Sequence, residues 1–183
     1  MAMAALLASA QTPPQSPSVL KVLDLFARLQ VSQQTHLPVS FNLTESEINE
    51  YARYTLVATP RPGLKSLSIK AFSNNYLSTF TVVDFDAVER WKPGTIPTIL
   101  KPVLSGRKSI WLDFRFQAHG GYTTFTVEKA YFDQIRLPAV FVAEMIRVVA
   151  ARQPEHFDTT RPVPLPFGLK EISSSNHSVS GRT

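Results

Sequence analysis

The chain has 183 residues, a formal net charge of +5 and no cysteine. A chain of this length suits one domain, which would bury about 70% of the surface that its unfolded form exposes. The lack of cysteine excludes, within this sequence, disulfides, thiolate chemistry, cysteine-bearing zinc sites and a lipid anchor on an N-terminal cysteine. The positive charge permits an anionic partner, either lipid headgroups or nucleic acid, without choosing between them.

The first residues differ in composition from the rest of the chain. Residues 1–8 are apolar, and Ala8-Ser9-Ala10 is a small-x-small site that a signal peptidase could cut after Ala10. The apolar part is short and no Lys or Arg precedes it, so an exported signal peptide, a frayed terminus and a truncated start all stay open. With the proline-rich linker that follows, this segment spans residues 1–17. No other stretch approaches the ~20 apolar residues of a membrane span, so we expect one soluble domain over residues 18–172.

An amphipathic helix is predicted for residues 18–34, with Ser18 as its N-cap. Its apolar residues recur at positions i, i+3, i+4 and i+7, the spacing of one helix face. They are Val19, Val22, Leu23 and Phe26. Residues 39–43, after Pro38, then read as a short extended segment.

Thr44 and Glu47 predict the start of a second helix. A threonine followed three positions later by a glutamate is a capping box, in which each side chain bonds the other residue's backbone amide. This helix should end before Pro60. Its apolar residues are Ile48, Tyr51, Ala52 and Leu56.

Residues 64–91 predict a hairpin that turns at Asn74-Asn75, because asparagine tolerates a left-handed backbone. With a two-residue turn, Ile69 lies opposite Phe80, and Val82 lies opposite Leu67. Both faces of this hairpin then carry apolar groups. Such a pattern is expected where helices cover one face and another apolar element contacts the other.

Residues 90–108 combine cations with a tryptophan and contain no acidic residue. Three prolines forbid a long regular helix in this segment. Trp91 beside lysines and arginines on an apolar loop suits docking onto an anionic membrane. A connection that packs its leucines inward and solvates its lysines explains the same residues. The predicted docking residues are Arg90, Trp91, Lys92, Lys101, Arg107 and Lys108.

Residues 108–132 predict a long hairpin with a Gly120-Gly121 turn, because glycine accepts a positive φ at no steric cost. The register puts Ile110 opposite Tyr131, Phe114 opposite Val127 and Phe116 opposite Phe125, which makes one face a wall of large apolar groups. The other face is polar, as in a sheet with one side toward water. On that face Asp113 falls opposite Glu128, and Arg115 is placed to relieve their repulsion.

The remaining chain predicts a helix, an edge strand and a tail. Pro138 can occupy the first turn of a helix that runs to about Arg152 and carries a wide apolar stripe, including Phe141 and Met145. Residues 161–172 have proline at alternate positions, which is tolerated at a sheet edge. Residues 173–183 are polar and predict a disordered tail.

The order of elements predicts an α+β fold, in which a curved antiparallel meander of about four long strands, plus an edge strand, wraps two or three amphipathic helices. Several segments resemble the small exported tubular lipid-binding (TULIP-like) proteins, including the LmeA-like, YpmS-like and YceB-like families. The likeness covers about residues 39–172 and its motifs are a helix cap and a turn. The matching residues are Thr44, Glu47, Ile48, Asn49, Leu165, Pro166 and Gly168.

This resemblance implies an apolar groove between sheet and helix that holds acyl chains. The sequence supplies enough large apolar residues to line such a groove, but the same residues would also fill a dry core. The predicted lining is Ile69, Phe80, Val82, Phe114, Phe116, Phe125, Val127, Phe141 and Met145.

Three function classes follow. The first is an extracytoplasmic lipid-binding or lipid-shuttling module, periplasmic or secreted, that needs no catalysis or cofactor. The second is a cell-envelope assembly or scaffold protein that binds a protein partner through an apolar face. The third, an enzyme, is not expected, because the chain lacks hydrolase, zinc-protease and phosphate-loop motifs and its four histidines lack metal-ligand spacing. Nucleic-acid binding is also not expected, because the cations do not mass on one helix or sheet face.

Overall fold

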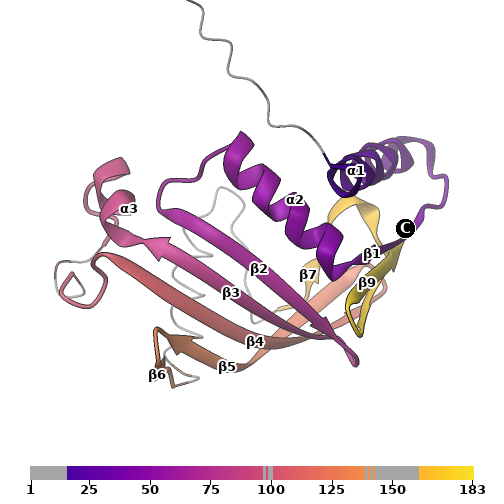
Figure 1. Ribbon diagram of the computed structural model, residues 1–183. Coiled ribbons are helices and arrows are strands. Elements are labelled where there is room, and N and C mark those ends of the chain that lie inside the picture. Colours follow the sequence, from indigo (N-terminus) through magenta and orange to yellow (C-terminus); the bar gives the residue numbers. More distant parts are fainter. Residues whose placement is uncertain (1–15, 97, 99–100, 139, 141, 143–160) are drawn as a thin grey trace, which may run out of the picture.

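Two antiparallel sheets and three α-helices make up the described part of this computed structural model, which covers residues 16–96, 98, 101–138, 140, 142 and 161–183. The fold is α+β, as the sequence predicts (Figure 1). In chain order the elements are α1 (Pro17–Thr35), β1 (Ser40–Thr44), α2 (Glu45–Ala58), β2 (Leu64–Phe72), β3 (Tyr76–Asp84), α3 (Phe85–Trp91), β4 (Arg107–His119), β5 (Tyr122–Phe132), β6 (Ile135–Arg136), β7 (Val163–Pro164), a 3-10 turn (Pro166–Gly168), β8 (Glu171–Ser175) and β9 (Ser178–Arg182).

The larger sheet has the order β2-β3-β4-β5-β6, with β7 pairing to the outer edge of β5. Its centre is the β4–β5 hairpin, which turns at Gly120-Gly121 with φ values of 58° and 85°. Phe114 lies opposite Val127 and Phe116 lies opposite Phe125, as predicted.

A bulge in β5 changes the register of this hairpin beyond Phe114. Because Glu128 is the extra residue, Asp113 lies opposite Lys129, and Ile110 lies opposite Phe132 rather than Tyr131. The predicted pairing of Asp113 with Glu128 is therefore wrong. The expected contact between Arg115 and Glu128 does form, as an ion pair.

The β2–β3 hairpin is shifted by one residue from the predicted register. Its loop contains residues 73–75, so Ile69 lies opposite Thr79 and Phe80 lies opposite Ser68. Both Asn74 and Asn75 adopt a positive φ, as expected of asparagine in a turn. A residue outside the hairpin stabilises this longer loop, because the Asn75 side chain accepts a hydrogen bond from the Ser174 amide.

The smaller sheet has the order β1-β9-β8 and includes the residues predicted to be a disordered tail. That prediction is wrong, because residues 173–183 contribute to β8 and form β9, whose two edges pair with β1 and β8. The Ser174 hydroxyl also donates to the carbonyl of Phe72 at the end of β2.

The first two helices begin at side-chain caps. Ser16, not Ser18, caps α1, so Pro17 of the expected linker is its first residue. The capping box of Thr44 and Glu47 forms at α2, as predicted. Helix α2 lies along the free edge of β2, where the Asn49 amide bonds both the N–H and the C=O of Ile69 at 2.8 Å. An edge whose backbone groups are paired this way is protected from other strands.

Helix α3 was not predicted, because the alternation of β3 was read as continuing to residue 91. The chain instead turns at Asp84, whose carboxylate accepts the Ala87 amide at 2.9 Å and caps the helix. The cap fits the preference of aspartate for this position.

The main core lies where α1, the small sheet and the 3-10 turn meet, at one end of the large sheet (Figure 1). Its buried residues are Val22, Leu25, Leu29, Leu43, Leu165 and Leu169. Leu23, predicted to face this core, is not among them. The helix expected from Pro138 to about Arg152 lies for the most part outside the described residues.

Candidate functional site

One face of the six-stranded sheet carries nearly all its large aliphatic residues, and we call it the apolar face. Directly paired residues share a face, so the register assigns the members from β2 to β5. Thr79 and Thr81 of β3 share this face, and its apolar members include Leu67, Ile69, Ala71, Leu77, Ile110, Leu112, Phe114, Phe116, Phe125, Val127, Ala130 and Phe132. The opposite face, the polar face, carries serine, threonine and charged residues with a few aromatic rings.

The apolar face is less completely buried than the main core. Ala71, Phe116, Ala130 and Phe132 are buried, but Leu77, Phe114 and Val127 are half-buried and Phe125 is 45% exposed. The rings of Phe114 and Phe125 meet edge to face, with centroids 6.1 Å apart. The face therefore combines a packed framework with large side chains that still contact water.

The structure separates the residues predicted to line one groove. Ile69, Phe114, Phe116, Phe125 and Val127 share the apolar face. The one-residue shift in β2–β3 moves two others, Phe80 and Val82, to the polar face, where Phe80 lies opposite Trp111 with ring centroids 6.2 Å apart. Phe141 and Met145, the last two, lie outside the described residues.

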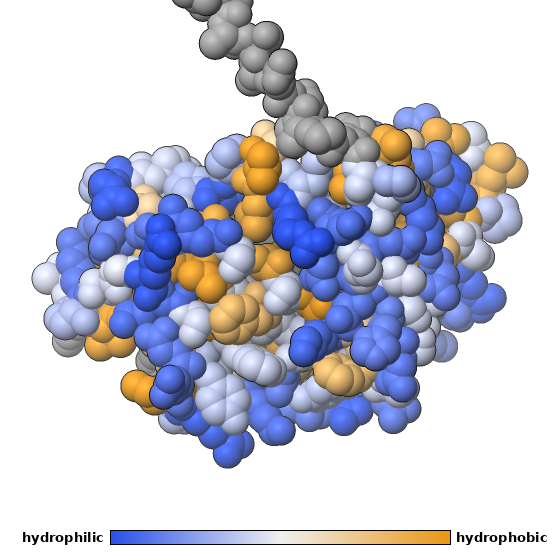
Figure 2. Space-filling model, in the orientation of Figure 1, coloured by the Kyte–Doolittle hydropathy of each residue, from blue (hydrophilic) through white to orange (hydrophobic). Residues whose placement is uncertain are grey.

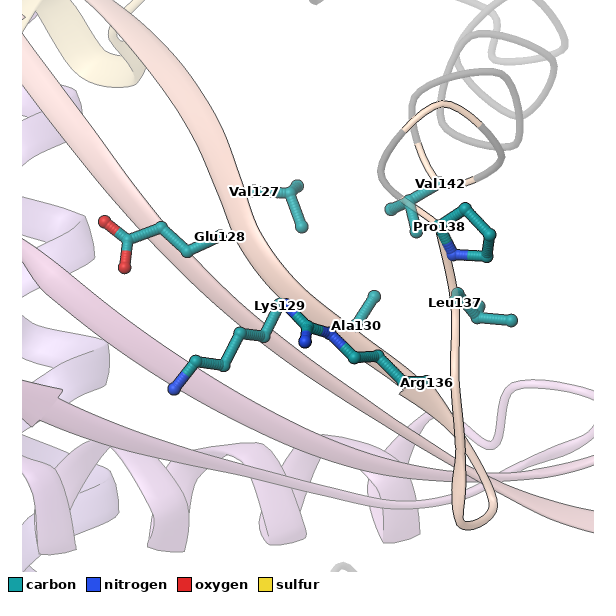
Figure 3. A pocket seen from close by; sticks show the side chains of 8 residues that line it. All are labelled: Val127, Glu128, Lys129, Ala130, Arg136, Leu137, Pro138 and Val142. Atoms are coloured by element: carbon teal, nitrogen blue, oxygen red, sulfur yellow. The ribbon is translucent and has the colours of Figure 1, made fainter.

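A pocket opens beside the apolar face, where β5 meets β6. Its volume is about 290 Å³. Val127 and Ala130 of β5 point toward Val142 on one side, while Glu128 and Lys129 point away to the other side of the strand (Figure 3). The remaining lining residues are Arg136, Leu137 and Pro138.

The sequence interpretation missed Arg136 and Lys129 as pocket residues. The available signal was the pair Asp133-Gln134, a two-residue turn that brings β6 back along β5. Asp133 adopts a φ of 53° there, as its short polar side chain allows.

The predicted docking residues divide into two groups. Lys101, Arg107 and Lys108 are ion-paired, with Nζ or Nε to carboxylate distances of 3.0 Å to Glu89, 4.0 Å to Asp84 and 3.3 Å to Asp133, respectively. These three ion pairs stabilise the loop before β4 and the start of β4.

Glu89 organises the loop after α3. Its carboxylate accepts the Gly94 amide, pairs with Lys101 and accepts the Ile96 amide, which lowers the pKa of Glu89 to about 2. Ile96 is buried under this arrangement. The interpretation of the segment as an ordinary connection thus fits its middle part.

Arg90, Trp91 and Lys92 lie at the exposed end of α3. The Trp91 side chain is 65% exposed, and Val103 nearby in sequence is also exposed. None of the ion pairs found between described residues includes Arg90 or Lys92. These three residues keep the composition expected of a surface that docks on a membrane.

The polar face contains a buried carboxylate that the sequence did not single out. Burial alone raises the pKa of Asp113, but hydrogen bonds from Ser78, Trp111 and Tyr76 outweigh it and hold the pKa below the usual value. The Trp111 Nε1 donates at 2.7 Å. Burial together with the bond to Asp113 raises the pKa of Tyr76 to about 12. The donors of this network all bond to Asp113, so we interpret the network as stabilising the fold rather than binding a ligand.

Groups suited to metal binding do not gather within the described residues. No three His, Asp or Glu side chains there are placed to hold one metal ion. No helix in that part of the chain is both long and apolar enough to cross a membrane. Apolar surface is thus the chemistry that the described site offers, with cations beside it.

Comparison of the chain with family models, with curated proteins and with solved structures gave no match. The resemblance to the tubular lipid-binding proteins therefore stays a prediction. The fold class rests on the structure alone.

Proposed function

We propose that this protein is an extracytoplasmic, non-catalytic module that binds or shuttles lipids, with acyl chains lying along the apolar face. The observation that supports the proposal most is that Phe114, Val127 and Phe125 remain half-buried or exposed on the face that carries most of the large aliphatic residues of the sheet. Figure 2 shows one face of the molecule, on which apolar side chains lie among hydrophilic ones.

The driving force is the transfer of methylene groups from water to the apolar face. Each buried methylene contributes about 0.8 kcal/mol, so a few suffice to offset the loss of translational freedom. Binding of this kind needs no reacting group.

Native mass spectrometry of the purified full chain tests the proposal. We expect a bound species whose added mass is that of a lipid and which is lost on delipidation. Protein that carries no lipid, and that binds none when acyl chains are added, would contradict the proposal and favour the alternative of an envelope scaffold that binds a protein partner.

A matched pair of substitutions locates the binding face. Phe125→Ser removes a ring that is 45% exposed on the apolar face, and Phe80→Ser removes one that is 39% exposed on the polar face. We expect the first to weaken acyl-chain binding and the second to leave it unchanged. Equal effects would show that the chains do not lie on the apolar face.

We also propose that the end of α3 docks the protein on an anionic membrane through Arg90, Trp91 and Lys92. Combined Trp91→Ala and Lys92→Ala should reduce sedimentation with vesicles that contain anionic lipid. The matched control is Tyr122→Ala with Lys70→Ala, which removes an exposed aromatic residue and a lysine from the polar face. If the variant with Trp91→Ala and Lys92→Ala sediments with the vesicles as the wild type does, the membrane-docking proposal is contradicted and residues 90–108 only connect β3 to β4.

A further inference from the structure

The pocket between β5 and β6 joins apolar and charged surface at one place. Val127 and Ala130 belong both to the pocket and to the apolar face, so the two are continuous. At about 290 Å³ the pocket is at the small end of ligand sites, which range over about 300–1,000 Å³. It suits one end of a long ligand better than a whole lipid.

The charges around the pocket are unequally compensated. Glu128 is paired with Arg115, so its negative charge is already neutralised. Lys129 lies opposite Asp113 and helps to hold the pKa of that carboxyl low. Ion pairs between described residues do not include Arg136. Those ion pairs do not include Lys129 either, but Lys129 faces Asp113, so we take Arg136 as the cation that the pocket presents to a ligand.

The position of Arg136 suits a headgroup at the boundary with water. Arg136 lies opposite Tyr131, which places its side chain on the polar face; it is exposed and extends back over β5 beside Ala130 and Lys129 (Figure 3). A guanidinium binds carboxylate or phosphate oxygens with two parallel N–H donors, which gives both affinity and orientation. The apolar wall begins on the other side of the same strand, at Val127 and Ala130.

We propose that the ligand is an anionic amphiphile, a fatty acid or an acyl chain with a phosphate headgroup, and that Arg136 binds its anionic group while the chain runs along the apolar face. This assignment rests on the proposed lipid-binding function. It adds the charge of the ligand and the direction in which it lies: the headgroup is at Arg136 on the polar side of the β5–β6 end, and the chain passes through the pocket at the outer edge of β5 onto the apolar face.

The experiment compares three probes on the full chain: oleate, its uncharged methyl ester and inorganic phosphate. We expect the wild type to bind oleate more tightly than methyl oleate. Arg136→Gln should weaken oleate binding about 10-fold or more, the effect of losing hydrogen bonds to a charged group, and should leave methyl oleate binding unchanged. Arg136→Lys should restore part of the loss. Lys70→Gln, which removes an exposed cation from the polar face of β2, is the matched control.

The outcomes separate the two proposals. If neither oleate nor its ester binds, the lipid-binding function itself fails. If both bind equally and Arg136→Gln binds oleate as the wild type does, only the headgroup assignment is overturned. If inorganic phosphate binds as tightly as oleate and displaces it, the site takes a free anion rather than an amphiphile, which also overturns the assignment. Circular dichroism and thermal unfolding of each variant verify that it is folded.

Discussion

The main core and the apolar face use similar residues but bury them to different degrees. In the core, Leu25 and Leu29 are each 2% exposed and sit between α1, the small sheet and the 3-10 turn. On the apolar face, residues of the same size such as Leu112 are half-buried. One end of the molecule therefore buries its large apolar side chains against its own elements, while the large sheet keeps apolar side chains that are partly exposed to water.

The largest expected effect comes from truncating a residue in each region. Leu25→Ala should lower the free energy of unfolding by about 2–5 kcal/mol, because it leaves a cavity in a closed core. Leu112→Ala should cost less, about 1–2 kcal/mol, because part of its side chain already contacts water. Urea unfolding measures both. Equal losses of unfolding free energy would contradict the conclusion that the main core is more completely buried than the apolar face.

Substitution of Asn49 tests whether the hydrogen bonds that this side chain makes to the edge of β2 stabilise the fold. Asn49→Leu removes two hydrogen bonds to the Ile69 backbone, and we expect a loss of about 1–3 kcal/mol. Faster amide exchange at Ile69 should accompany it. Arg53→Leu changes an exposed residue on the same helix and serves as the control; a loss as large as that of Asn49→Leu would assign the effect to the helix rather than the edge.

The pH dependence of stability tests the polar face. The pKa of Asp113 is lowered in the folded state, so its contribution is present above the unfolded value of about 3.9 and is lost as the pH falls through the folded value. The contribution of Tyr76 to stability depends on pH in the opposite direction. Its pKa is raised to about 12, so its contribution is complete below about pH 10 and is lost as the pH rises toward 12.

Unfolding free energies measured across pH check these signs. Asp113→Asn should flatten the acid limb, and Tyr76→Phe should flatten the alkaline limb. Tyr122→Phe removes an exposed phenol and should leave the profile as it is. An alkaline limb that persists in Tyr76→Phe would show that another group causes it.

The smallest effect concerns Thr123, at the point where the apolar face meets the main core. Its hydroxyl is buried and has no hydrogen-bond partner, and its opposite neighbour Ala118 packs against the core. Thr123→Val replaces that hydroxyl by a methyl group of similar shape. We expect stability to rise by up to about 1 kcal/mol, measured by urea unfolding with Thr124→Val, an exposed neighbour, as the control. A destabilised Thr123→Val variant would mean that the hydroxyl is satisfied in solution.

Local chemistry made part of the fold predictable. The capping box at Thr44 and the Gly120-Gly121 turn each satisfy backbone groups within a few residues, so the sequence alone determines them. The pairs Phe114 with Val127 and Phe116 with Phe125 follow from that turn because they lie before the bulge.

Features that depend on distant partners were not predictable. The loop at residues 73–75 is held by Ser174, and the serine-rich strands β8 and β9 depend on β1 for pairing. A shift of one residue exchanges the two faces of a strand, which is why Phe80 and Val82 were assigned to the wrong side. The Asp84 cap of α3 was visible in the sequence, but the preceding alternation favoured a longer strand.

The pairing of β1 with β9 has a consequence for how the chain assembles during synthesis. The Val39 amide bonds the Thr183 hydroxyl across a separation of 144 residues, and β9 is the middle strand of its sheet. While the ribosome still holds the later residues, β1 has no neighbour, and the leucines of α1 lack the surface on which they finally pack. The two long hairpins can form first, because their contacts are local. We therefore expect closure of the α1 end to be the last step, and the leucines of α1 to stay exposed to solvent and to chaperones in a nascent chain that pauses before Ser178.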